Sequence, residues 1–252
     1  MTLYTVNIQK GGALLEDSRR LLEAWNLLET PEANLERITS GNLLGKTTRR
    51  RSDDILMRIL RPRLVSPGPQ VIPAMRLLLH QGRALTEALY FEAANDDALL
   101  AAFAEGPLHD WYESGRTGIS IEDVTNWLAG ESTSGRAAEW TPTVRNKVGS
   151  GLLAALRDFG VLEGTVHKTF ASPRMSLPGF AYVAYRLHEG GLSSRAIAES
   201  HVWRRWLLDQ AHVDDLLAQA TRAHVLTYGS VGSTVRIDWH VHELEEAVRV
   251  AA

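Results

Sequence analysis

Apolar residues recur at the spacing of an α-helix through most of this chain, and this recurrence restricts the fold more than any other feature. In segments 13–28 and 52–60, for example, leucine, isoleucine and tryptophan fall on one side of a helix. Patterns typical of β-strands are confined to two short stretches, 165–170 and 225–239. The sequence therefore predicts a mainly α fold with short β-hairpins.

Changes in this pattern indicate where domains begin and end. Gly106-Pro107 is the clearest break in the first half of the chain, and everything before it reads as helix. We expect a helical N-terminal domain over 1–105, a winged helix-turn-helix-like module over 106–174, and a C-terminal helical module with a β-hairpin over 175–252. A second winged helix and a plain α/β cap are alternative readings of the last module.

The middle module carries strong helix-start signals. Ser120 followed by Asp123 has the spacing of a capping box, and Thr141 is placed to cap a helix over 142–158. A short β-forming stretch, 165–170, comes next. Helix, polar loop, helix and β segment is the order of a winged helix-turn-helix, although many small α/β modules share it.

The helix over 142–158 has two different faces. Its apolar stripe is predicted to face the core and consists of Val144, Val148, Leu152, Leu156 and Phe159. The opposite face has no acidic and no large apolar residue and consists of Thr143, Asn146, Lys147, Ser150, Ala154 and Arg157. We predict that this face enters a DNA major groove, with Arg145 at its flank and Lys168 on the β segment contacting phosphate. The alternative is an amphipathic helix whose polar face meets only water.

Charge is unevenly distributed along the chain. The formal net charge is −3, yet segment 34–63 holds eight basic residues against three acidic ones. Lys46, Arg49, Arg50 and Arg51 belong to this basic run, and we predict that the three arginines begin an exposed helix and contact phosphate. The alternative is a solvated surface whose cations pair with neighbouring acids.

Signals for catalysis, metal or cofactor binding are missing. The chain has no cysteine, no phosphate-binding loop and no hydrolase serine motif. Asp238, His240 and His242 alternate as metal ligands on a strand would, but an exposed strand edge explains them as well. We expect no catalytic site, no metal and no cofactor. Trp203-Arg204-Arg205-Trp206 suggests base stacking, against the simpler reading of a helix that buries both tryptophans.

The sequence also argues against a membrane protein. Apolar runs such as 77–79 are interrupted by His80, Gln81 and Arg83, far short of the roughly 18 residues that span a bilayer. The first twelve residues have no apolar core of signal-peptide length. We therefore expect a cytoplasmic protein.

Two strings in the first 65 residues resemble the BrxA family of BREX phage-defence systems. One is Tyr4-Thr5-Val6-Asn7-Ile8-Gln9-Lys10-Gly11-Gly12-Ala13-Leu14-Leu15. The other is Asn42-Leu43-Leu44-Gly45-Lys46, followed by a polar and basic run into Ile55-Leu56. The order of elements continues the likeness through most of the chain. These strings indicate kinship and are not catalytic motifs.

The resemblance implies a small helical, non-enzymatic protein that is similar to the NusB antitermination proteins and binds double-stranded DNA through winged-helix elements. It also implies partners within a defence system, such as a methyltransferase, an ATPase and a phosphatase-like protein. An RNA-binding or transcription-regulatory role of the NusB kind is the alternative. The sequence does not indicate the oligomeric state or a DNA sequence preference.

Overall fold

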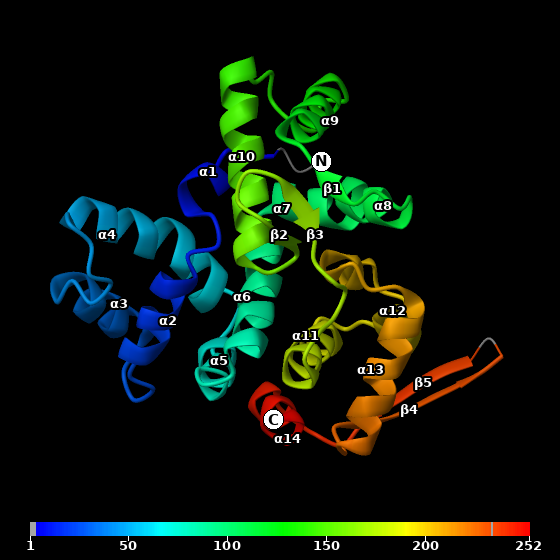
Figure 1. The fold of residues 1–252 in the computed structure, drawn as a ribbon. Coiled ribbons are helices and arrows are strands. Elements are labelled where there is room, and N and C mark those ends of the chain that lie inside the picture. The colour runs from blue at the N-terminus through cyan, green and yellow to red at the C-terminus, as the bar shows by residue number, and fades with distance from the viewer. Residues whose placement is uncertain (1–3, 233) are drawn as a thin grey trace. The chain divides into compact units, whose positions relative to one another are not determined.

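The structure is a computed structural model that describes residues 4–232 and 234–252 (Figure 1). Helices predominate, and the strands of the described residues form two small antiparallel sheets. The predicted mainly α fold class is therefore confirmed. Whether the modules are winged helices in detail stays a prediction. Ser233, which belongs to the predicted turn of the second hairpin, lies outside the described residues.

The chain divides into two compact units, each assembled from separate segments. The first unit comprises Met1–Ala13, Ala93–Arg174 and His201–Asp209, and the second comprises Leu14–Glu92, Met175–Ser200 and Gln210–Ala252. The sequence predicted three consecutive domains, and that division stays a prediction. The domain boundary predicted after residue 174 coincides with a boundary of these units. The short segments 1–13 and 201–209 belong to the first unit, although they are distant in sequence from its main segment, 93–174.

The first unit is built around two helices and a three-stranded sheet. Its elements, in chain order, are α1 (Ile8–Gly11), α7 (Ala98–Phe103), η2 (Ala104–Leu108), α8 (His109–Glu113), β1 (Gly118–Ile119), α9 (Ile121–Thr133), α10 (Pro142–Asp158), β2 (Leu162–Glu163), β3 (Lys168–Phe170) and η3 (His201–Trp206). Strand β3 lies between β1 and β2 and is antiparallel to both. Within this unit α9 and α10 pack against each other, and α1 packs on α10.

Aromatic rings form the centre of the first unit. Phe103 is fully buried and lies between Trp127, with ring centroids 5.0 Å apart, and Trp111, at 5.9 Å in an edge-to-face arrangement. The buried guanidinium of Arg205 on η3 pairs with Glu105 at 2.7 Å. Because a buried cation is stable only when it is paired, this contact fixes the segment 201–209 in the unit.

The second unit is helical with one β-hairpin. Its elements are α2 (Leu15–Ala24), α3 (Pro31–Ser40), α4 (Arg49–Ile55), η1 (Leu56–Val65), α5 (Val71–Leu77), α6 (Gly82–Asp96), α11 (Leu177–Glu189), α12 (Ser194–Ala198), α13 (Gln210–Arg222), β4 (Leu226–Val231), β5 (Thr234–Trp239) and α14 (Leu244–Ala251). Helix α6 runs past the limit of the unit at Glu92. Helices α12 and α13 pack on the hairpin, which extends beyond α13 (Figure 1).

Two prolines, Pro62 and Pro107, lie where the sequence predicted breaks, and the structure differs at the two positions. Pro62 lies within η1, a π-helical segment whose last turn is closed by a hydrogen bond from Ser66 N to Arg61 O. Pro107 lies within η2, next to Gly106, whose φ of −104° and ψ of −105° are not helical. The wider π turn of η1 accommodates the Pro62 ring without ending the helix, whereas the non-helical backbone at Gly106 kinks the chain and separates two helices, as the sequence predicted.

The described residues contain no helix that is both long enough and apolar enough to cross a bilayer.

Candidate nucleic-acid interface

Local sequence signals position α10, the predicted recognition helix. Thr141 is extended and its side-chain oxygen accepts a hydrogen bond from Val144 N, while Pro142 occupies the first helical position. The side of the helix predicted to face the core is buried, apart from the half-buried Val144, and it includes Val148, Leu152, Leu156 and Phe159. The start of the helix and its core-facing stripe are therefore as predicted.

Two glycines let neighbouring helices approach α10 closely. A Cβ on Gly151 would lie 3.2 Å from the backbone of Ile8 and Gln9, in or beside α1. A Cβ on Gly149 would lie 3.0 Å from the Ile121 side chain at the start of α9. Both glycines therefore serve helix packing within the unit, which offsets the roughly 1 kcal/mol that each costs in a helix interior.

The opposite side of α10 is polar and accessible. Thr143, Asn146, Lys147 and Ser150 are exposed, and the remaining predicted contacts, Arg145, Ala154 and Arg157, are half-buried. Within this stripe Arg157 pairs with Asp158 at 2.6 Å. A helix that exposes an amide, an ammonium and two hydroxyls in one row presents the donors and acceptors that read base edges or bind phosphate.

The start of α9 is held by a charged cluster. Ser120 and Asp123 form the predicted capping box, and Arg116 pairs with Asp123 at 2.7 Å. Burial raises the pKa of Asp123, but hydrogen bonds from Arg116 and Ser120 outweigh burial and lower it overall. The guanidinium of Arg116 also lies over the Trp111 ring, 4.9 Å from its centroid. The negative charge of Asp123 is thus balanced by Arg116, and the surface around it is mainly cationic.

The connection from β2 to β3 forms a turn beside α10, and Lys168 supports it from inside. The Lys168 side chain is only 8% exposed, and its ammonium donates to the carbonyl oxygens of Gly164, at 2.8 Å, and Thr165. Burial lowers the pKa of Lys168, and the nearby charge of Arg157 lowers it further. The phosphate contact predicted for Lys168 stays a prediction. In the structure its ammonium supports the turn and also lines the cavity beside it.

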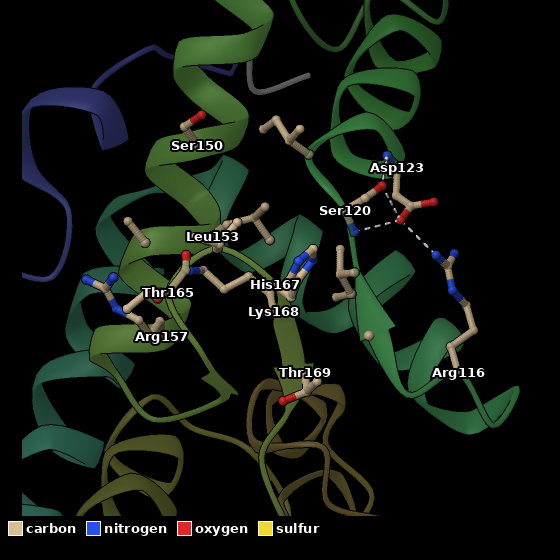
Figure 2. A pocket seen from close by; sticks show the side chains of 15 residues that line it. Arg116, Ser120, Asp123, Ser150, Leu153, Arg157, Thr165, His167, Lys168 and Thr169 are labelled. Carbon is tan, nitrogen blue, oxygen red and sulfur yellow. Dashed lines mark hydrogen bonds and ion pairs between the residues drawn. The ribbon is translucent and has the colours of Figure 1, made fainter.

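A cavity of about 740 Å³ lies where these parts meet. It is lined by β1, the start of α9, the half of α10 that carries Ser150, Leu153 and Arg157, and the turn residues 165–169. Figure 2 shows His167 and Lys168 between α10 and the segment that carries Ser120. The lining contains three cations, Arg116, Arg157 and Lys168, and one carboxylate, that of Asp123. The polar stripe of α10 therefore continues into a cationic hollow.

The predicted basic run lies in the second unit. Arg49, Arg50 and Arg51 are exposed and begin α4 as predicted, with Thr48 capping the helix through a hydrogen bond from Arg51 N. Lys46 is half-buried and pairs with Asp17 at 2.5 Å. Several other cations of the run are also occupied or buried: Arg37 pairs with Glu29, Arg58 pairs with Asp54, and Arg63 is 5% exposed. The exposed cations of the run are thus Arg49, Arg50, Arg51 and Arg61, together with Arg58, which is paired with Asp54.

Other sets of residues singled out in the sequence do not form binding sites. Trp203 and Trp206 are buried, as the simpler reading of that segment expected, so they offer no base-stacking surface. Asp238 pairs with Arg236, and His240 bonds the Thr227 hydroxyl through Nε2. These contacts direct Asp238 and His240 to different partners.

Sequence reasoning did not single out several polar residues that line the cavity, among them Arg116, Thr165 and His167. Arg116 is brought there by β1, which is only two residues long and therefore leaves no alternating pattern in the sequence. Thr165 and His167 belong to the turn between β2 and β3, and only the pairing of these strands shows that the turn lies beside α10. The signal that was available is Gly164, a typical turn residue, which has a φ of +85°.

Comparisons with known proteins give one family and one fold. The family model named BrxA matches residues 2–184. A crystal structure of an uncharacterized protein from Magnetospirillum magneticum superimposes with a TM-score of 0.61 at 20% identity, covering 81% of this chain and 97% of that one. At this identity the likeness concerns the fold alone. No curated protein matches the sequence.

Proposed function

This chain belongs to the BrxA family, which is not a known enzyme family and points to a BREX-associated protein, and from that premise we propose that it binds double-stranded DNA without catalysing a reaction. In this proposal α10 is the element that enters the major groove. The turn between β2 and β3 lies over the neighbouring backbone as a wing. The three arginines at the start of α4 add phosphate contacts that are independent of sequence.

The observation that carries the proposal is the surface of α10. One side of the helix is anchored by buried residues, and the other exposes Thr143, Asn146, Lys147 and Ser150 without an acidic neighbour in the row. The same row leads into the cationic cavity. A surface meant only to be hydrated does not need this segregation of charge, whereas a polyanion requires it.

Topology gives further support. The element order β1, α9, α10, β2, β3, with β3 between the other two strands, is typical of winged helices. One feature departs from a compact helix-turn-helix. Residues 134–141 connect α9 to α10, which is longer than the usual three or four residues. The connection is anchored at one point by Glu131, which pairs with Arg136.

The proposal is tested by the double variant N146A/K147A. Both side chains are exposed, so the fold should be retained, and affinity for duplex DNA should fall about tenfold or more, since each base contact contributes roughly 1–3 kcal/mol. Fluorescence anisotropy over a salt series measures this. A matched control is N126A/R249A, which also removes one amide and one cation from exposed helix positions. Parental affinity in N146A/K147A would remove α10 as the reading element.

A second arm of the same titration uses R49A/R50A/R51A. These residues should contribute only charge, so binding should weaken equally for all sequences, and the slope of log affinity against log salt should become shallower by up to about 2.7 for three lost contacts. R58A is the control, because Arg58 is exposed but already paired with Asp54. Stronger binding to single-stranded RNA than to the duplex, at matched salt, would instead favour an RNA-binding role.

A further inference from the structure

The first unit contains a buried histidine with an unused ring nitrogen. His109 begins α8 and is 3% exposed, and its Nδ1 atom is buried without a hydrogen-bond partner. The distance from this nitrogen to Glu113 Oε2 is 3.7 Å, which is too long for a hydrogen bond. Buried polar atoms almost always have a partner, so this one calls for an explanation.

Two exposed carboxylates converge on the same place. Ligand atoms of His109, Asp110 and Glu113 all lie within 4.8 Å of one another, and no other group of three such residues does so among the residues that the structure describes. Donors about 2.1 Å from a shared tetrahedral ion are about 3.4 Å apart. The separation of 3.7 Å between His109 and Glu113 is close to that value, and the Glu113 side chain, 57% exposed, is free to rotate.

Burial favours the neutral imidazole, and the hydrogen bonding of the ring decides which of its nitrogens keeps a lone pair. Burial lowers the pKa of His109, and Arg204 lowers it further, against the opposing effect of Glu113 and Asp110. A backbone hydrogen bond with Leu208 raises this pKa, as expected when a ring N–H donates to a carbonyl. Since Nδ1 has no partner, the donor in that bond is Nε2. A backbone acceptor on one ring nitrogen and a free lone pair on the other is the usual state of a metal-ligating histidine.

We propose that His109, Asp110 and Glu113 form a three-ligand site for a divalent transition-metal ion, with zinc as the best-fitting ion. An imidazole and two carboxylates suit zinc, whereas magnesium prefers oxygen ligands only. Water completes the coordination on the exposed side. The charge of Arg204 opposes a cation here, and the two carboxylates outweigh it. The sequence analysis expected no metal, because it weighed only Asp238, His240 and His242.

The ligand spacing also gives the site a structural consequence. The three residues lie at the first, second and fifth positions of α8, so a bound ion would clamp this single helical turn from end to end. Arg116, which pairs with Asp123 at the start of α9, follows three residues after α8. The proposal is independent of nucleic-acid binding, and its failure would leave the function proposed above untouched.

The test is calorimetric titration of the dialysed full chain with zinc chloride in a buffer that does not chelate metal. One ion per chain is expected. D110N and E113Q change exposed side chains, so folding should be retained. Even loss of a second-shell partner weakens metal binding about 10–100-fold, so each of these variants should lose at least tenfold in affinity.

Controls distinguish this site from adventitious binding by surface groups. E32Q removes an exposed carboxylate from another helix, and H240Q/H242Q removes the other histidines that the sequence suggested, so both should bind zinc as the parent does. The variant H109Q should abolish binding, with circular dichroism to check its fold. Absence of stoichiometric binding, unchanged affinity in D110N and E113Q, or loss of binding in H240Q/H242Q would each overturn the proposal.

Discussion

At the scale of single residues, buried charges are used to join segments that are distant in sequence. Glu87 on α6 accepts hydrogen bonds from both the backbone N–H and the hydroxyl of Ser176 and pairs with Arg83. Glu92, one turn and a half further along α6, pairs with Arg186 at 2.9 Å and accepts a hydrogen bond from the Tyr182 hydroxyl. Within the second unit these contacts attach α11 to α6, and the partners of each carboxylate oppose the cost of its desolvation.

Glu87 should make stability depend on pH. Burial raises its pKa above the ordinary 4.5, although Ser176 and Arg83 act in the opposite direction. The folded state therefore holds this proton more tightly than the unfolded chain. The resulting stabilisation is complete below about pH 4.5 and is lost as pH rises through the folded pKa.

The variant E87Q isolates this effect, because glutamine has nearly the same shape and does not titrate. Urea unfolding at pH 4.5, 5.5 and 7 should show the parent losing stability relative to E87Q as pH rises. E32Q, at an exposed position, should show no such trend. A difference between parent and E87Q that stays constant or grows in favour of the parent with rising pH would contradict the expected sign.

At the scale of elements, α10 depends on glycine for its contact with α1. The substitution G151A would place a Cβ 3.2 Å from the backbone of α1 residues, which cannot rotate away. G149A would place its Cβ against the Ile121 and Val124 side chains, which can adjust. Alanine gains about 1 kcal/mol of helix propensity at either position. We therefore expect G151A to lower the free energy of unfolding more than G149A, as measured by urea denaturation; the reverse order would contradict the packing described here.

Helix positions and helix starts were the best-predicted features of the elements. Ser120 and Thr141 cap helices as expected, because capping depends on residues only three positions apart. The exposed row of α10 followed from its helical period in the same way. These features are local, and local signals are what a single sequence contains.

Features that depend on distant pairing were not predictable in this way. Strands β1 and β2 have two residues each and are held by their pairing with β3. They are too short to show the alternation of apolar and polar residues that indicates a strand. That Lys168 is buried and that its ammonium donates to the Gly164 carbonyl likewise depend on the tertiary turn, which the sequence does not indicate. The His109 cluster was missed because its only sequence signal, a histidine near two acids, is common on helix surfaces.

At the scale of the whole molecule, the first unit is not contained in one continuous segment. A chain of residues 93–174 alone lacks α1, which packs on α10, and η3, whose Arg205 pairs with Glu105. We expect this fragment to melt without the cooperative transition of the full chain, because Glu105 and the α1-facing side of α10 lose their partners.

Thermal unfolding followed by circular dichroism measures the difference between fragment and full chain. The full-length variant R205M, which removes the ion pair but keeps η3, serves as the intermediate case and should melt between the two. A fragment that unfolds with the parent's cooperativity and midpoint would show that segments 1–13 and 201–209 are dispensable for this unit.

The interleaving of the two units also determines how the protein can fold as it is made. Residues 201–209 complete the first unit and residues 210–252 complete the second, so neither unit has all its parts until most of the chain has left the ribosome. Domains that are continuous in sequence fold one after another during synthesis. Here the helices that are synthesised first keep apolar surface exposed to water until their partners are made. The long sequence separation between the contacting segments also slows folding. Nascent chains of this protein should therefore need more protection by chaperones than chains whose domains are continuous in sequence.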